Sequence, residues 1–178
     1  VKAVEYLVRR KLSDLGLTGI SELTHFACTS EDINNLSYAL TISAAVREVW
    51  LPKFRSVIAA LRERAIELRD DAMLAHTHGQ PATPTTMGKE LAVFVYRLDR
   101  ILAQIEATEY LGKFSGATGT FAAHLAADAT QDWPAISNEF VTSLGLTWNP
   151  LTTQIESHDW QAELYSRISH ANRVLHNL

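Results

Sequence analysis

Two histidines lie two residues apart in the stretch MLAHTHGQPATPTTMGKE. The ordinary pKa of an imidazole lies near neutrality, so His78 could donate or accept a proton, and Thr77 beside it offers a neutral hydrogen bond. Pro81 and Pro84 exclude a helix interior here, so we expect a short non-helical histidine loop that fixes the direction of these side chains. A histidine that only satisfies backbone groups is the alternative.

Metal binding is a second alternative for the closely spaced pair His76 and His78. Zinc sites are completed by further histidine, cysteine or carboxylate ligands, and this stretch provides no cysteine, aspartate or nearby glutamate that completes a set. The sequence therefore predicts no metal site.

A second polar segment, HFACTSEDINN, places Thr29 and Ser30 where a helix is expected to begin. Hydroxyl groups and free backbone N–H groups at a helix N-terminus can bind a carboxylate or phosphate. The simpler alternative is that one of these hydroxyls only caps the helix.

Two further segments contain residues that suit binding. The stretch LGKFSGATGTFAAH has three closely spaced glycines, but it lacks the order of the dinucleotide-binding fingerprint, so a tight turn or a close backbone approach is expected. The stretch WNPLTTQIESHD places Gln154 and His158 where a loop enters the last helix, a position that helix capping alone could explain.

Helical periodicity dominates the rest of the chain, and strand signals are weak. Apolar residues recur every three or four positions in the first segment, which Gly16 ends, and Pro52 is expected to kink the second helix or to start a new segment. We therefore predict an all-α fold. The expected helices cover about residues 1–16, 30–50, 53–70, 85–110, 134–144 and 156–178.

Composition restricts the class of protein. The 178 residues are 47% hydrophobic, enough for one domain with a sizeable core, and the formal charge of −4 excludes the basic surface that nucleic acid requires. No apolar run is long enough to cross a membrane, the N-terminal segment does not resemble a signal peptide, and Cys28 alone permits no internal disulfide. We expect a cytoplasmic protein.

The segment Ile33–Val46 contains no charged residue, although it is long enough for a helix with a solvent-facing side. A helix of this kind is expected to be enclosed on most faces, which favours a homo-oligomeric helical bundle. A single core helix with small polar residues on its outer side is the alternative.

Taken together, the motifs TSEDINN, THGQPATPTTMGK, FVTSLGLTWNP and TTQIESHD resemble the bacterial adenylosuccinate lyases of the fumarase/aspartase superfamily. This resemblance implies a long-helix bundle, no cofactor and a homotetramer with shared active sites. The implied reaction releases fumarate from adenylosuccinate, giving AMP, and from the succinylated aminoimidazole carboxamide ribotide, so the partners would be small purine nucleotides.

The resemblance also implies a role for individual residues. His78 would be the acid that protonates the departing nitrogen, and Thr77, Thr29, Ser30 and Gln154 would bind the substrate. His76, Ser115 and Thr120 depart from the family pattern. Residues 1–178 would form the central helical part of the enzyme, lacking the N-terminal segment and the serine loop that supplies the general base, so the chain alone would be inactive.

Two other functions remain open at this point. A sister lyase that acts on argininosuccinate or fumarate would share the helical bundle and the histidine. A non-catalytic helical scaffold would keep the apolar stripes, but it would have no use for four polar motifs in one family's order.

Overall fold

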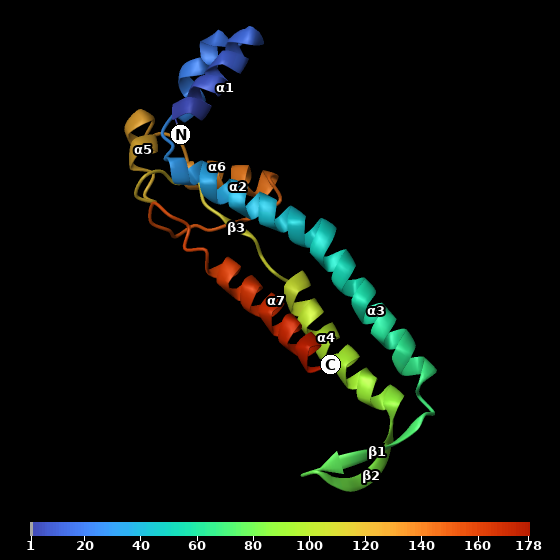
Figure 1. Ribbon diagram of the computed structural model, residues 1–178. Coiled ribbons are helices and arrows are strands. Elements are labelled where there is room, and N and C mark those ends of the chain that lie inside the picture. The colour runs from blue at the N-terminus through green and yellow to red at the C-terminus, as the bar shows by residue number, and fades with distance from the viewer. Residues whose placement is uncertain (1) are drawn as a thin grey trace. The chain divides into compact units, whose positions relative to one another are not determined.

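The computed structural model describes residues 2–178, which divide into two compact units (Figure 1). The first unit contains the chain up to Thr41 together with Glu109–His158, and the second contains Ile42–Thr108 and Asp159–Leu178. Helices make up most of the described residues and the strands are few and short, which confirms the predicted all-α class.

The first unit is built from short helices and two short strands. Its elements are α1 (Lys2–Asp14), the 3₁₀ helix η1 (Thr18–His25), the start of α2 (Ser30–Ala44), β3 (Leu111–Gly112), α5 (Ala122–Ala127), α6 (Trp133–Ser143) and β4 (Thr147–Trp148). Strands β3 and β4 pair in parallel. The helices η1 and α5 were not predicted, and both are shorter than the periodic signal of a typical amphipathic helix.

The core of the first unit contains charged as well as apolar side chains. Its buried apolar residues include Leu36, Val141 and Leu146, but Asp32 and Lys113 are buried just as completely. Because a buried charge must be paired, the position of these two side chains already indicates an internal ionic contact.

The second unit contains three long helices and a hairpin. Its elements are the end of α2, the π-helical turn η2 (Ala45–Trp50), α3 (Leu51–Glu67), β1 (Ala72–Thr77), β2 (Gln80–Thr86), α4 (Met87–Glu106) and α7 (Asp159–Asn177). Helix α4 packs against both α3 and α7 (Figure 1). The buried residues Ile58, Leu98, Ile101, Leu164 and Ala171 form the centre of this packing.

Pro52 does not break the helix in which it lies. The chain is helical without interruption from Ser30 to Glu67, and Pro52 occupies the first turn of α3, directly after the π-helical turn. A proline lacks the N–H that would bond one turn back, and directly before it the Leu51 N–H donates to the Val46 carbonyl, the wider spacing of a π-helical turn. The sequence predicted a kink or a new segment, whereas the structure continues the helix and changes only its hydrogen-bonding pattern, from π to α, directly before Pro52.

The predicted non-helical histidine segment is a β-hairpin, so its backbone is more regular than a loop. Strands β1 and β2 are antiparallel, with His76 opposite Pro81 and Leu74 opposite Pro84, and a bulge lies between Leu74 and His76. Both strands of a two-stranded ribbon are edge strands, and edges tolerate the missing N–H of a proline.

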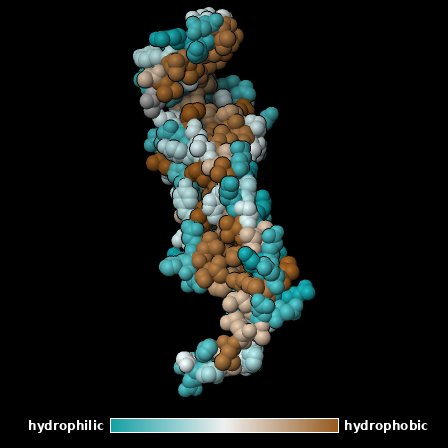
Figure 2. All heavy atoms as spheres, turned by 45° about the vertical axis from the view of Figure 1, so that its right-hand side comes forward, coloured by the Kyte–Doolittle hydropathy of each residue, from teal (hydrophilic) through white to brown (hydrophobic). Residues whose placement is uncertain are grey.

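Many large hydrophobic side chains are exposed on this chain. On α1, Val4, Tyr6 and Leu7 are more than half exposed, and Figure 2 shows hydrophobic atoms gathered over the part of the molecule that contains this helix. On α2, Ile33, Tyr38 and Leu40 are exposed as well, so the uncharged segment is not enclosed within a single chain. Within residues 2–178, no helix is long and apolar enough to cross a membrane.

Candidate functional site

The predicted site residues fall into two groups. Thr29, Ser30 and Gln154 lie in the first unit, and Thr77 and His78 lie in the second. Each group is described within its own unit.

His78 occupies the tip of the hairpin. His78 and Gly79 both have positive φ, of 50° and 75°, as a type I′ turn requires at its two central residues. Thr77 and His78 are exposed. The tight turn therefore presents an imidazole at the end of a ribbon, where a substrate can reach it.

Thr29 and Gln154 come into direct contact although they lie 125 positions apart in the sequence. The side-chain amide of Gln154 donates to Thr29 Oγ1 at 3.1 Å. Ser30 follows as the first residue of α2 and is half-buried. Two of the predicted binding residues thus lie together at the N-terminus of a 15-residue helix.

Capping does not explain the Thr29 hydroxyl. The Asp32 carboxylate accepts from the Thr29 backbone N–H at 2.8 Å, and the Asp32 backbone N–H donates to the Thr29 carbonyl at 3.1 Å. In a capping box the side chain of the third helical residue accepts from the N-cap N–H, and the N-cap hydroxyl accepts from an N–H of the first turn. Asp32 and Thr29 form the first of these two bonds, and the Thr29 hydroxyl takes no part in it. The hydroxyl instead accepts the hydrogen bond from the Gln154 side-chain amide.

A fully buried ion pair lies behind this helix end. Lys113 Nζ contacts Asp32 Oδ1 at 2.8 Å and donates to the Gly116 carbonyl at 3.0 Å. Asp32 also accepts from the backbone N–H groups of Ser115 and Gly116. Asp32 and Lys113 are both 0% exposed, so their charges neutralise each other inside the unit.

Asn35 completes the same cluster. Its side-chain amide donates to the Lys113 carbonyl at 2.9 Å, and its oxygen accepts from the Lys113 backbone N–H at 2.8 Å. The start of α2 is therefore attached to the glycine-rich segment by a continuous set of hydrogen bonds. The sequence predicted no role in the site for Asp32, Asn35 or Lys113, although an acidic residue at the third position of a helix is a readable signal of its N-terminus.

The glycine-rich segment makes the predicted close approach at Gly119. A Cβ at this position would lie 2.2 Å from the Thr152 carbonyl oxygen, so only glycine fits. Ser115 Oγ lies 3.5 Å from Thr152 Oγ1, and Thr118 and Thr120 share a hydrogen bond. The segment with Gln154 thus packs directly against the glycine-rich segment.

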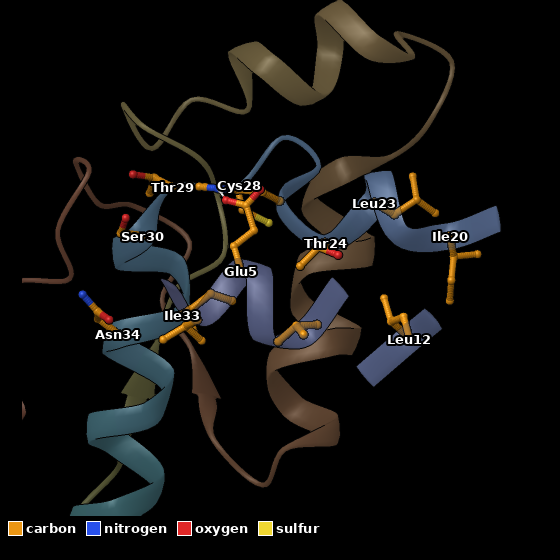
Figure 3. A pocket seen from close by; sticks show the side chains of 13 residues that line it. Glu5, Leu12, Ile20, Leu23, Thr24, Cys28, Thr29, Ser30, Ile33 and Asn34 are labelled. Carbon is orange, nitrogen blue, oxygen red and sulfur yellow. Dashed lines mark hydrogen bonds and ion pairs between the residues drawn. The ribbon is translucent and has the colours of Figure 1, made fainter. Parts of the chain in front are cut away.

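An apolar cavity of about 490 Å³ lies beside Thr29 and Ser30. Figure 3 shows Leu12, Ile20 and Ile33 among its lining residues. Cys28 lies in the same lining, and burial, together with the negative charge of Asp32, raises the pKa of its thiol to about 11. Because the thiolate is the reactive form, Cys28 is a poor nucleophile near neutral pH.

His124 is a buried imidazole without a hydrogen-bond partner among the described residues. Its ring lies 5.1 Å from that of Trp133 and 5.5 Å from that of Phe121, measured between centroids. Burial lowers the pKa of His124; the Lys113 charge acts in the same direction and the Asp32 charge in the opposite one. The imidazole is therefore neutral at neutral pH.

This lowered pKa predicts a pH-dependent stability. Below the ordinary histidine pKa of about 6.5 the unfolded chain binds a proton that the folded chain does not, so the free energy of unfolding falls as the pH drops from 7 to 5. Replacing His124 by phenylalanine should reduce this fall, as measured by urea unfolding at several pH values. The exposed His170 is the control, and an equal reduction in His170→Phe would contradict the assignment.

The described residues contain no group of three or more histidine, cysteine or acidic side chains arranged to hold a metal ion. The groups that meet at the start of α2 are the hydroxyls of Thr29 and Ser30, the side-chain amide of Gln154 and the free N–H groups of the helix N-terminus. This set suits a ligand with carboxylate oxygens.

The sequence profile of a family described as "Lyase" matches residues 2–177, so this chain belongs to that lyase family. It is 51% identical to the adenylosuccinate lyase of Escherichia coli over 98% of its length, and 51% identical to that of Vibrio cholerae. The resemblance found in the motifs is thereby confirmed. The chain spans 39% of the length of these relatives.

Solved structures show the same fold. A fumarate lyase from Mesorhizobium superposes with a TM-score of 0.72 at 24% identity, over 94% of this chain and 42% of that one. A β-carboxy-cis,cis-muconate cycloisomerase from Acinetobacter calcoaceticus gives 0.73 at 23% identity, over 94% of this chain and 37% of that one. At these identities the likeness concerns the fold alone.

Proposed function

We propose that this chain is part of an adenylosuccinate lyase, which eliminates fumarate from adenylosuccinate to leave AMP and acts likewise on the succinylated aminoimidazole carboxamide ribotide. The observation that carries the proposal is the contact of Gln154 with the Thr29 hydroxyl, because it joins two family motifs at one helix end and leaves the hydroxyl out of helix capping. The identity to adenylosuccinate lyases supports the same reaction.

The elimination needs an acid and a base. A base removes a proton from the carbon beside a succinyl carboxylate, the electron pair forms the carbon–carbon double bond of fumarate, and the carbon–nitrogen bond breaks. His78 donates a proton to the departing nitrogen, which would otherwise leave as a poor anionic leaving group. Thr77, next to His78 on the hairpin, holds the substrate beside the imidazole.

The N-terminus of α2 offers groups that can bind the succinyl carboxylates of the substrate. Thr29 and Ser30 offer hydroxyls, and the first-turn N–H groups form the positive end of the helix dipole. A bare Asp32 carboxylate one turn into the helix would repel an anionic substrate, but the ammonium of Lys113 at 2.8 Å cancels its charge. Gln154 adds an amide from the opposite segment.

The proposal also covers the oligomeric state of the complete protein and its place in the cell. The enzyme is a cytoplasmic homotetramer in which residues 1–178 form a central helical part, each active site combines motifs of different subunits, and the general base comes from outside these residues. The exposed apolar side chains Ile33, Tyr38 and Leu40 in the uncharged segment Ile33–Val46 support such assembly. The mass of the complete protein in solution tests it, and a monomer would contradict it.

Fumarate release by the complete protein tests the activity. We expect turnover with adenylosuccinate, and none with argininosuccinate or malate, when fumarate formation is followed by absorbance. The 178-residue chain alone should release none, since it would lack the base. Preference for argininosuccinate or malate would replace the proposed substrate, and rapid turnover by the 178 residues alone would place the base among them.

A further inference from the structure

The segment that carries Gln154 has no regular secondary structure. Residues 149–158 connect β4 to α7 and contain neither helix nor strand. The Gln154 side chain is exposed and reaches Thr29 through one hydrogen bond of 3.1 Å. Other contacts must therefore fix the course of this segment.

Glu156 lies inside the segment and is 0% exposed. Its Oε1 accepts from the side-chain amide of Asn149 at 2.9 Å, and its Oε2 accepts from the backbone N–H of His158 at 2.7 Å. One buried carboxylate thus joins the two ends of a ten-residue stretch, with Gln154 between them.

The imidazole of His158 lies against this carboxylate. Its Nδ1 lies 3.4 Å from Glu156 Oε2, and its ring meets the ring of Tyr38 on α2 edge-on, with 6.2 Å between centroids. His158 has a φ of 59°, a conformation that a non-glycine residue adopts only where its surroundings enforce it. The hydrogen bond from the His158 N–H to Glu156 is one contact that holds the backbone in this conformation.

Asn149 is held independently at the other end. Its backbone N–H donates to the Gly112 carbonyl at 2.8 Å, next to the paired strands β3 and β4. The segment is therefore anchored to the sheet at Asn149 and to α2 at His158, and Glu156 sets the separation of these two anchors. Gln154 is placed by this arrangement.

We propose that Glu156 and His158 are positioning residues that hold Gln154 against Thr29 for substrate binding, an inference that rests on the proposed lyase function. Glu156 does not touch substrate in this assignment. Its effect passes through the placement of Gln154, so its loss weakens substrate binding more than it slows the chemical step.

The experiment compares Glu156→Gln, Glu156→Ala and Gln154→Ala in the complete protein, with adenylosuccinate as substrate. The first variant keeps one carbonyl acceptor but places an amide donor in the buried site, and the second removes both acceptors. We expect Glu156→Gln to raise KM by about 5- to 10-fold, in line with the loss of one hydrogen bond, with kcat changed less than KM. Glu156→Ala should raise KM further.

A double-mutant cycle separates positioning from a merely structural role. If Glu156 acts through Gln154, then Glu156→Gln should add no further increase of KM in the Gln154→Ala background. Glu139→Gln, which removes an exposed carboxylate on α6 in the same unit, is the matched control and should leave both constants unchanged. An equal increase in both backgrounds, or an unchanged KM with a lower kcat, would overturn the inference.

Amide hydrogen exchange measures, without any substrate, how firmly the segment that carries Gln154 is held in place. We expect the backbone amides of residues 154–158 to exchange at least about tenfold faster in Glu156→Gln than in the unsubstituted protein or in Glu139→Gln. Unchanged exchange would contradict the positioning role. Absence of fumarate release from the unsubstituted protein, with faster exchange in the variant, would reject the proposed reaction and leave the structural part of the inference standing.

Discussion

Replacing His78 in the complete enzyme is expected to lower kcat for fumarate release by ~10²–10⁴-fold, the usual contribution of general acid catalysis. The reason is that the departing nitrogen must receive a proton, and the imidazole at the hairpin tip is the group assigned to donate it. KM should change less, because Thr29, Ser30 and Gln154 are assigned to binding. The measurement is steady-state fumarate formation from adenylosuccinate.

The backbone at His78 decides which substitution is informative. Its φ of 50° is unfavourable for alanine, whereas asparagine tolerates this conformation and cannot donate a proton as an acid. Both His78→Asn and His78→Ala should lose activity, and His76→Ala should lose much less. If His78→Asn kept near-normal turnover, the tip would matter for its shape, and the acid would be another residue.

Replacing Lys113 by methionine is expected to lower the free energy of unfolding by ~3–5 kcal/mol, the usual cost of removing one partner of a buried ion pair. The Asp32 carboxylate would remain fully buried, 0% exposed, with no positive charge beside it. Denaturant unfolding of the complete protein, followed by the loss of helical circular dichroism, measures the change. Substrate binding should weaken as well, because Asp32 would then repel the succinyl carboxylates.

Two comparisons test this explanation. The double variant Asp32→Asn with Lys113→Met should be more stable than Lys113→Met alone, because no unpaired charge remains. Arg55→Met breaks the exposed pair with Glu106 and should cost less than ~1 kcal/mol. Equal losses in Lys113→Met and Arg55→Met would show that the buried pair contributes little.

The sequence predicted the helices well because their signal is local. Apolar spacing placed the α6 region at about 134–144, against Trp133–Ser143 in the structure, and the hydroxyl pair marked the start of α2. The last helix begins at Asp159 instead of about residue 156, because Glu156 turns inward and holds the preceding segment together. The hairpin had a readable signal in the His-Gly pair, since both residues of its turn need positive φ.

The site itself was only partly readable. Motif resemblance selected Thr29 and Gln154, which the structure brings into contact, but their pairing across 125 positions has no local signature. The partnership of Asp32 with Lys113 is equally invisible, because a sequence does not tell which charge is buried with which. The catalytic role assigned to His78 and the binding roles assigned to Thr29, Ser30, Thr77 and Gln154 stay predictions until the variants are measured.

The close approach at Gly119 limits which sequences this fold accepts. At Gly79 the constraint is conformational alone: φ is 75° and a Cβ would meet open space, so asparagine is a viable replacement. At Gly119 the φ of 71° combines with a carbonyl oxygen 2.2 Å from any Cβ, and no backbone-compatible residue escapes that collision. In a library of functional variants, position 79 should therefore drift among a few residues, while position 119 should stay glycine.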